Sequence, residues 1–311
     1  MTDILIMGEL LVEIMRDQTD GELYEAGIFR GPYASGAPAI CASSAARLGS
    51  KVAVVGAVGN DDFGRCIVDR LKSCNVDTSL INHVQEVATG VAFNTYFPDG
   101  SRKFIFHMGN SAAIRAKAPD VSKLDGLKFM HIMGCSLASN KEYAKEILKT
   151  MHAACGKGAQ ISFDPNVRKE LFTDDSFSET LEDVLNHTSI FLPGVEELEM
   201  MMNKDTVEEA IDKCFTYPSM KMVLLKNGSK GSILFVKGQE PKVFNAYKIV
   251  QKDATGAGDC FDGAFLAGIS QNKDLDTACR WASAAGALNA AAFGPMEGDI
   301  SIETVEKMIE G

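Results

Sequence analysis

The feature that most restricts the fold is an alternation between short apolar β-rich segments and segments of helical length. Strands that alternate with helices predict an α/β fold, with a mainly parallel central sheet flanked by helices on both faces. The expected strands are DILIM (3–7), VAVVG (52–56), FMHIM (129–133), AQISFD (159–164), SIFLP (189–193) and MVLLK (222–226). The expected helices cover 37–49, 61–74, 141–155, 205–215 and most of 259–310.

A second pattern interrupts this alternation between residues 89 and 108. The stretch TGVAFNTYFPDGSRKFIFHM has two β-rich halves about a PDG turn, which predicts a hairpin. Together with residues 24–36, this hairpin is expected to form a small β lid inserted in one domain spanning 1–311. Its side chains Phe93, Phe104 and Phe106 are predicted to pack within the lid, and Arg102 to be solvated.

Composition disfavours several classes of protein. The chain carries 31 Lys and Arg against 42 Asp and Glu, a net charge of -11 that disfavours nucleic-acid binding. Apolar stretches fall short of the roughly 18 residues of a membrane span, and the N-terminus lacks the features of a signal peptide. The eight cysteines form no CxxC pair and no zinc-type spacing with a histidine. We therefore expect a cytoplasmic protein with reduced thiols and no structural metal.

The segment TGAGD (255–259) points to the chemistry. Asp259 is an acceptable N-cap for a helix running from Cys260 to about Ser270, and this is the simpler interpretation. However, Gly256 and Gly258 allow unusual backbone angles and close approach, and N–H groups at a helix start attract anions. We call the backbone N–H groups of 256–258 the anion nest. A carboxylate beside such a nest suits a general base in phosphoryl transfer.

Other phosphate-binding and hydrolytic motifs are missing from the sequence. There is no GxxxxGK[ST] loop, no GxGxxG after the first strand and no GxSxG elbow. A nicotinamide-dependent dehydrogenase is therefore disfavoured.

Several segments, taken together, resemble the ribokinase-like (PfkB) carbohydrate kinases. DATGAGDCFDGAFLAG (253–268) is similar to their C-terminal signature, and SGAPAICASSAARLGSKVAVVGAVGNDDFG (35–64) to their N-terminal one. FDPNVR (163–168), LPGVEELE (192–199) and LLKNGSKG (224–231) match further family segments in the same order. The resemblance implies a ribokinase-like fold with a small β lid, and Mg²⁺- and ATP-dependent phosphorylation of a sugar hydroxyl.

The same resemblance implies roles for individual residues. Asp259 would be the general base, with the N–H groups of Gly256, Ala257 and Gly258 as the anion hole. The nucleotide would lie near Lys226, Asn227, Gly228 and Asn166. Glu197 would orient water around Mg²⁺. Asp253 and Thr255 match residues that bind a monovalent cation such as K⁺ in several members, although members differ in using this ion.

The sugar side departs from the family pattern. The usual diglycine is Ser35-Gly36, the following Asn is Ile40, and the Asp near the end of the first strand is Glu13. These residues and Arg168 are the candidate substrate contacts. Glu9 and Glu13 have an alternative interpretation as surface acids at a strand end. The Asn of the N-x-x-E segment is Gly194.

These observations favour a kinase of a free ketohexose, tagatose or fructose, with resemblance to a tagatose-kinase subgroup. A 2-keto-3-deoxygluconate kinase remains an alternative, because Arg168 or Arg102 would suit the carboxylate of this keto acid. A nucleoside kinase is a further alternative. The alternative from another class is a non-catalytic sugar-binding or sensor protein, which an intact Asp259 and nest disfavour. The expected partners are then a small sugar and ATP, and neither a nucleic acid nor a membrane. A homodimer formed through the lid is a further expectation.

Overall fold

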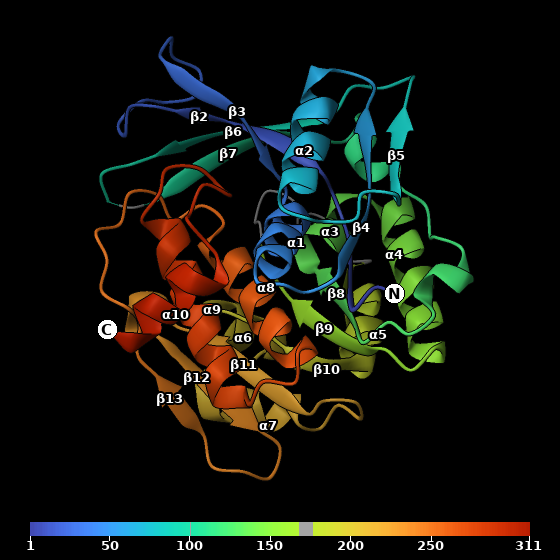
Figure 1. The fold of residues 1–311 in the computed structure, drawn as a ribbon, viewed down its shortest axis with the longest axis vertical. Coiled ribbons are helices and arrows are strands. Elements are labelled where there is room, and N and C mark those ends of the chain that lie inside the picture. Colours follow the sequence, from blue (N-terminus) through green and yellow to red (C-terminus); the bar gives the residue numbers. More distant parts are fainter. Residues whose placement is uncertain (100, 168–176) are drawn as a thin grey trace.

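The computed structural model describes residues 1–99, 101–167 and 177–311. A nine-stranded sheet crosses the centre, in the order β13-β12-β11-β10-β9-β8-β1-β4-β5 (Figure 1). The strands from β11 to β5 are parallel, and β12 and β13 add an antiparallel edge. The strands are β1 (Ile4–Met7), β4 (Val52–Gly59), β5 (Ile81–Val84), β8 (Phe129–Met133), β9 (Gln160–Asp164), β10 (Thr188–Phe191), β11 (Met222–Lys226), β12 (Ser232–Val236) and β13 (Lys242–Phe244).

Helices cover both faces of this sheet, as the alternation predicts. One layer contains α1 (Ala37–Arg47), α2 (Asp62–Ser73), α8 (Ala257–Ser270), α9 (Leu275–Ala290) and α10 (Ile302–Glu310). The other contains α3 (Gly134–Ser139), α4 (Lys141–Gly156), α5 (Phe177–His187), α6 (Val195–Met202) and α7 (Val207–Cys214). Three short 3₁₀ helices occupy Ala112–Ile114, Val121–Leu124 and Gly228–Lys230.

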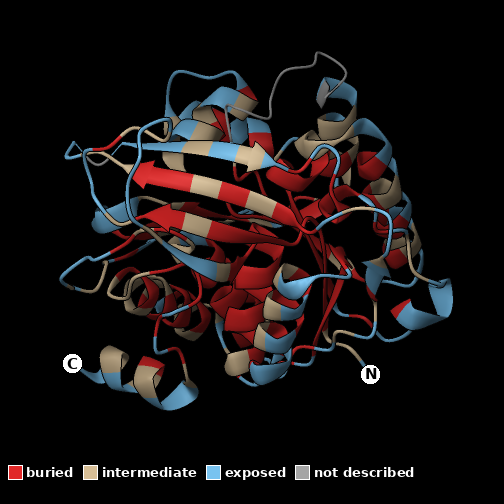
Figure 2. Cartoon of the chain, turned by 90° about the horizontal axis from the view of Figure 1, so that it is seen from above, coloured by how far each residue is buried: buried red, intermediate tan, exposed pale blue. Residues whose placement is uncertain are grey.

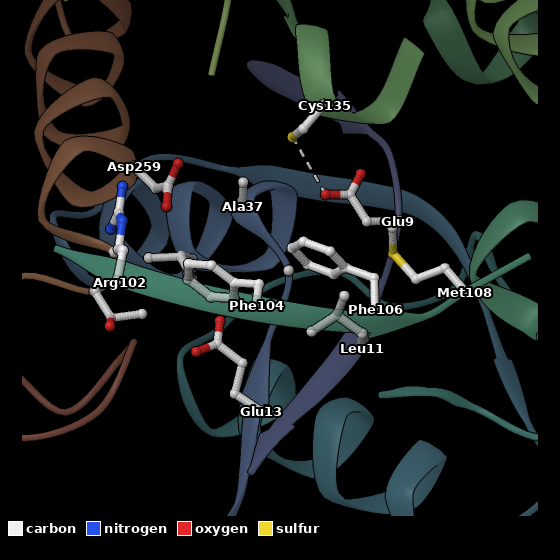
Figure 3. Close-up of a pocket in the computed structure, with 14 residues that line it drawn as sticks. Glu9, Leu11, Glu13, Ala37, Arg102, Phe104, Phe106, Met108, Cys135 and Asp259 are labelled. Carbon is white, nitrogen blue, oxygen red and sulfur yellow. Dashed lines mark hydrogen bonds between the residues drawn. The ribbon is translucent and has the colours of Figure 1, made fainter. Parts of the chain in front are cut away.

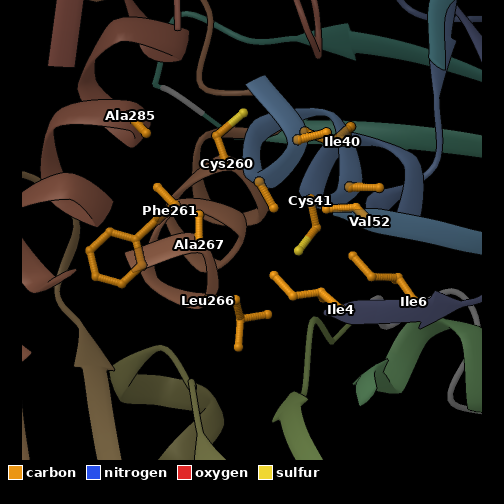
Figure 4. Close-up of a cluster of buried hydrophobic side chains, with 14 of the residues drawn as sticks. Ile4, Ile6, Ile40, Cys41, Val52, Cys260, Phe261, Leu266, Ala267 and Ala285 are labelled. Carbon is orange, nitrogen blue, oxygen red and sulfur yellow. The ribbon is translucent and has the colours of Figure 1, made fainter. Parts of the chain in front are cut away.

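The central strands are apolar throughout because both of their faces are covered. In β1, Ile4 and Ile6 point to the layer of α1 and α8, whereas Leu5 and Met7 point to the layer of α4. Figure 4 shows the first of these cores, where Cys41 of α1 and Leu266 of α8 lie beside β1. Such double burial explains why these strands read as continuous apolar runs instead of alternating ones.

A separate four-stranded sheet, the lid, has the order β3-β2-β6-β7. Its strands are β2 (Leu11–Arg16), β3 (Phe29–Ser35), β6 (Gly90–Tyr96) and β7 (Arg102–His107). Strands β6 and β7 form the predicted hairpin, and β3 comes from the 24–36 segment. Burial falls from the inner strands to the exposed edge of this sheet (Figure 2). Strand β2 is not among the strands expected from the sequence.

The strand order reverses at β1, and this reversal locates the site. From β1 the chain adds β4 and β5 on one side, and later β8 through β11 on the other. In parallel α/β sheets, ligands bind beyond the carboxyl ends of strands at such a reversal. Glu9 follows β1, Asn166 follows β9, and Lys226 ends β11, so all three lie at this edge.

Candidate active site

The glycine that precedes α8 has a backbone conformation that other residues avoid. Gly256 has φ 74° and is the N-cap of α8, which begins at Ala257. A Cβ at Gly256 would lie 2.4 Å from the carbonyl oxygen of Pro295, so only glycine fits. The expected helix start at Cys260 is therefore wrong. Asp259 lies inside the first turn of α8, where it does not act as the cap.

The first turn of α8 leaves space for an anion. The first N–H groups of a helix have no carbonyl partner within that helix, and here the Ala257 N–H donates to the Ala254 carbonyl oxygen over 3.3 Å. Among the described residues, a Cβ at Gly258 would meet only Nζ of Lys226, at 3.9 Å. The nest is thus open in front and backed by a cation, which suits a phosphate group.

Asp259 is buried and held by a residue far away in sequence. Its exposed fraction is 5%, and its Oδ1 accepts a 2.6 Å hydrogen bond from Nδ2 of Asn166. Asn166 follows β9 with φ 41°, and its own N–H donates to Asp164. The side-chain amide of Asn166, which we assigned to the nucleotide from the resemblance, therefore contacts the candidate base.

Lys226 forms a buried ion cluster behind the nest. Its Nζ lies 3.0 Å from a carboxylate oxygen of Asp164 and 3.0 Å from one of Asp262. Burial raises the pKa of both carboxyl groups, but the charge of Lys226 and a hydrogen bond from Asp262 bring the pKa of Asp164 below its ordinary value. The pKa of Asp262 stays well above its ordinary value. Asp262 therefore keeps its proton to a higher pH than Asp164 does.

The cation itself stays charged. Burial lowers the pKa of Lys226, but Asp164 and Asp262 together raise it above its ordinary value. The positive charge of Lys226 is thus already balanced in part by Asp164 and Asp262, whereas a solvated lysine would have its full charge available to a nucleotide. The next residues, Asn227 and Gly228, lie nearer the surface in a turn after β11.

A cavity opens between the nest and the lid. It is lined by Glu9, Leu11, Glu13, Gly36, Ala37, Ile40, Arg102, Phe104, Phe106, Met108, Cys135, Thr255, Gly256 and Asp259. Figure 3 shows three carboxylates around it, those of Asp259, Glu9 and Glu13, with two phenylalanine rings among them. The chain therefore brings together acidic groups from β2, from the segment after β1 and from α8.

Glu13 lies on β2 of the lid and not at the end of the first strand, so that expected placement is wrong. Its exposed fraction is 7%. Oε1 accepts a 2.7 Å hydrogen bond from the Ser35 hydroxyl, and Oε2 accepts one of 2.7 Å from Nδ2 of Asn94. Ser35 is fully buried behind Glu13. Its role is thus to orient that carboxylate.

Glu9 is the second carboxylate that lines the cavity. It is 4% exposed, which excludes the interpretation as a surface acid. The Ser136 hydroxyl donates a short hydrogen bond to it, and the Cys135 thiol donates another over 3.3 Å. Both donors lie in α3, directly after β8, and Glu9 itself follows β1. The ends of these two neighbouring strands therefore hold the carboxylate in position.

The remaining walls combine apolar and cationic groups. Ile40 of α1 packs beneath the nest, 3.1 Å from where a Gly256 Cβ would lie. Phe104 and Phe106 of β7 stack with ring centroids 5.4 Å apart, and the Arg102 guanidinium lies 5.7 Å from the centre of the Phe104 ring. The predicted packing of these two rings is found, but the rings and Arg102 also line the cavity.

Comparison with known proteins identifies the family. Residues 1–301 match the family model described as pfkB family carbohydrate kinase. The chain belongs to this family. As a PfkB carbohydrate kinase, it is a phosphotransferase with a sugar hydroxyl as acceptor. Fructokinase-1 of Oryza sativa subsp. japonica is 31% identical over 302 residues, covering 94% of this chain and 92% of that protein.

Solved structures agree with this carbohydrate-kinase family. An E. coli protein provisionally named ribokinase II, solved with ATP and Mg²⁺, is 35% identical with a TM-score of 0.93, covering 100% of this chain and 99% of its own. A fructokinase from Vibrio cholerae O395, 22% identical with a TM-score of 0.84, covers 99% of this chain and 98% of its own and shows the same fold. The ribokinase-like fold expected from the sequence is confirmed.

The kinase's candidate magnesium residue, Glu197, caps α6. Its Oε2 accepts from the Gly194 N–H over 2.8 Å and its Oε1 from the Val167 N–H over 2.7 Å. Each oxygen retains a second lone pair, so the carboxylate still suits a water bound to Mg²⁺.

The candidate monovalent-cation loop is tightly bonded within the protein. Asp253 accepts from the N–H groups of Thr255 and Gly294, each over 2.9 Å. The Thr255 carbonyl accepts from Asn289, and its hydroxyl bonds to Tyr96 of the lid. Burial and the Asp253 charge raise the pKa of Tyr96 to about 12, so this phenol is neutral and can donate. The oxygen-rich donor set suits a hard monovalent cation.

Sequence reasoning missed part of this site. Arg168, a candidate substrate contact, lies outside the described residues. Asn94, Glu9 and the Asp164–Asp262 pair were not assigned. Asp164 had one usable signal, because it is a carboxylate at the carboxyl end of a buried parallel strand. Asn94 had none, because its importance depends on the pairing of β6 with β2.

No helix in the described part of the chain is long and apolar enough to span a membrane.

Proposed function

We propose that the protein transfers the γ-phosphoryl group of ATP to a hydroxyl of a neutral ketohexose, fructose or tagatose. The observation that carries this proposal is Asp259, a buried carboxylate on the cavity wall within one residue of an open anion nest. A base in that position reaches the substrate hydroxyl while the nest faces the transferred phosphoryl group. Several relatives are named fructokinase, including the rice protein.

Asp259 acts as the general base in this proposal. The 2.6 Å hydrogen bond from Asn166 restrains the carboxylate, which borders the cavity where the sugar hydroxyl would lie. The N–H groups of the nest then hold the charge that develops on the phosphoryl oxygens. Lys226, 3.9 Å from a Gly258 Cβ position, adds a fixed positive potential behind the nest.

Glu9 and Glu13 recognise the sugar. Both carboxylates are buried, and each is oriented by two protein donors. Both line the cavity, where sugar hydroxyls would donate charge-assisted hydrogen bonds to them, and such bonds are roughly twice as strong as neutral ones. Gly36 and Ile40 provide a close apolar surface beneath the ring.

The charge of the cavity favours a neutral sugar over a keto acid. Three carboxylates line it, against Arg102 as the one cation among the described lining residues. A 2-keto-3-deoxy acid would bring a further negative charge to this set. Arg102 is the observation in favour of that runner-up, because its guanidinium lines the cavity and could pair with the carboxylate of a keto acid.

ATP and Mg²⁺ complete the site in this proposal. Mg²⁺ neutralises charge on the phosphates when it is bound, with Glu197 holding one of its waters. Lys226, Asn227 and Gly228 border the nucleotide, and the Asp253–Thr255 loop is the site for K⁺. Support comes from the ATP and Mg²⁺ in the related E. coli structure and from the open cradle at Gly258.

The lid closes over the sugar and excludes water that would compete as acceptor. The Tyr96–Thr255 hydrogen bond links it to the loop before the nest.

We also propose a homodimer through this sheet, supported by Tyr24 and Ile28, which are 82% and 63% exposed beside β3. Light scattering would measure the mass of the protein in solution, and the mass of two chains would support the homodimer. The proposed compartment is the cytoplasm, supported by eight free cysteines.

A coupled assay of ADP release tests the function. Fructose, tagatose, aldohexoses, 2-keto-3-deoxygluconate and nucleosides are compared at equal concentration with ATP and Mg²⁺. The proposal expects the largest kcat/KM with a ketohexose. A larger kcat/KM with the keto acid or a nucleoside would overturn the substrate assignment. ATP binding without turnover on any acceptor would favour the sensor alternative.

A further inference from the structure

Two helices on the outer surface bring together a group of metal-binding side chains. His152 lies near the end of α4, while Asp183 and His187 lie one turn apart on α5, which packs against α4. Both helices belong to the layer on the right of Figure 1. None of the three residues lines the sugar cavity, so the kinase reaction leaves this cluster unexplained.

The three side chains already converge. Nε2 of His152 lies 2.9 Å from one carboxylate oxygen of Asp183, and Nδ1 of His187 lies 3.2 Å from the other. One ligand atom from each residue can be chosen so that all lie within 4.8 Å of one another. Ligands bonded at about 2.0–2.1 Å in a tetrahedral zinc site lie roughly 3.3 Å apart. Closing that difference requires only side-chain rotation at a partly exposed surface.

Further contacts favour ligation. Nδ1 of His187 lies 2.8 Å from the backbone carbonyl oxygen of Asp183. In the tautomer that donates Nδ1–H to this oxygen, His187 presents Nε2 as the ligand atom, as metal-binding histidines commonly do. The side chains of His152, Asp183 and His187 are 48%, 32% and 36% exposed, so a cation can reach them from solvent.

The donor set selects the type of cation. Two imidazoles and one carboxylate suit Zn²⁺ and its first-row neighbours, whereas Mg²⁺ and Ca²⁺ prefer oxygen ligands alone. Three protein ligands leave a position for water. A hydrogen-bonded His–Asp–His group that joins the helices without metal is the simpler explanation, and the two differ in whether added metal raises stability.

We propose that His152, Asp183 and His187 form a binding site for one divalent transition cation of the zinc class, which clamps α4 to α5. The sequence predicts no structural metal, because its cysteines form no CxxC pair and no zinc-type spacing with a histidine. Here His152 and Asp183 are 31 positions apart, and only helix packing makes them neighbours. The metal would join α4 to α5. Helix α4 follows α3, and residues of α3 orient Glu9, whereas α5 leads into β10.

Calorimetric titration of the full-length, chelator-treated protein with ZnCl₂ tests the site directly. The expected result is one ion per chain, and a rise in Tm of the native protein when Zn²⁺ is present. Mg²⁺ at millimolar concentration is not expected to compete. His187→Ala and His152→Ala should each weaken Zn²⁺ binding by at least about tenfold, since even indirect supporting residues contribute 10–100-fold. Asp183→Asn provides a near-isosteric third variant if an alanine variant folds poorly.

Two control variants separate this site from other zinc-binding groups. His83→Ala removes an exposed histidine on β5, and Cys155→Ser removes a half-buried thiol one turn beyond His152. Both should leave one ion bound with unchanged affinity. The proposal is overturned if wild type binds no Zn²⁺, if the histidine variants bind as tightly as wild type, or if Cys155→Ser alone abolishes binding. Catalytic activity enters none of these readouts.

Discussion

The side-chain amide of Asn166 donates a 2.6 Å hydrogen bond to the carboxylate of Asp259. The two residues come from the ends of different elements, β9 and α8, and meet at the wall of the cavity. Because one carboxylate oxygen is occupied by this donor, the orientation of the other is fixed. A base that must reach one substrate hydroxyl gains from such a fixed orientation.

Asp259→Asn tests the base. The substitution is nearly isosteric, so folding and nucleotide binding should persist while kcat falls by about 10²-fold or more. Asn166→Ala should lower kcat less, because the carboxylate is still present but free to rotate. The double variant should be no slower than Asp259→Asn, since both changes act on one group. Additive losses in steady-state kinetics would show that Asn166 acts elsewhere.

Two glycine substitutions separate the anion nest from the turn that builds it. Gly258→Val places a branched side chain where Lys226 is the sole described neighbour within 4 Å, so the protein should fold but lose most of its turnover. Gly256→Ala meets Pro295 and needs φ 74°, so it should destabilise the fold by at least about 1 kcal/mol. Urea unfolding and kcat together check this. If the Gly258→Val enzyme had a normal kcat, the first turn of α8 would have no role in catalysis.

The buried cluster predicts unequal effects for two aspartates that contact the same lysine. Asp262→Asn should cost less than about 1.5 kcal/mol, because the raised pKa of Asp262 favours the protonated carboxyl group, which the amide resembles. Lys226→Met leaves the Asp164 charge buried and unpaired, which should cost about 3–5 kcal/mol. Chemical denaturation at pH 7 measures both. An Asp262→Asn variant as unstable as Lys226→Met would mean that Asp262 is ionised.

Glu13→Ala tests sugar recognition. A carboxylate that accepts from sugar hydroxyls contributes roughly 1.5–3 kcal/mol per charge-assisted hydrogen bond, so the sugar KM should rise about tenfold to a hundredfold. The KM for ATP should hardly change. Glu86→Ala, at an exposed site outside the cavity, is the matched control. If the KM for ATP rises and the sugar KM stays constant, the sugar does not bind at β2.

His131 predicts a loss of stability in mild acid. Burial lowers the pKa of this β8 imidazole to about 4, and its Nδ1 bonds to Ser162. The unfolded value is about 6.5, so the stabilisation is complete above that pH and is lost as pH falls from there towards 4. Between pH 7 and pH 5 the loss from this group should be about 2 kcal/mol. Urea unfolding of wild type and His131→Gln at both pH values checks this. An equal loss in both proteins would contradict it.

The sequence by itself determined the elements and the type of chemistry. Apolar runs of strand length predicted β1, β4, β8, β9, β10 and β11, because residues buried on both faces of a parallel sheet must all be apolar. The TGAGD segment predicted a nest with a carboxylate beside it, since two closely spaced glycines before a helix act locally. Resemblance to a kinase family followed from the order of such local segments.

Tertiary structure alone decided which groups meet. Glu13 joined the lid because β2 pairs with β3 and β6, and this pairing supplied Ser35 and Asn94 as its partners. Asp259 lies inside α8 instead of capping it, because the left-handed Gly256 starts the helix earlier. The pKa of Asp262 depends on its burial and on Lys226 and Asp164, which lie on other elements. Hydrogen bonds and charges act over a few ångströms in space, whereas sequence patterns report only neighbours along the chain.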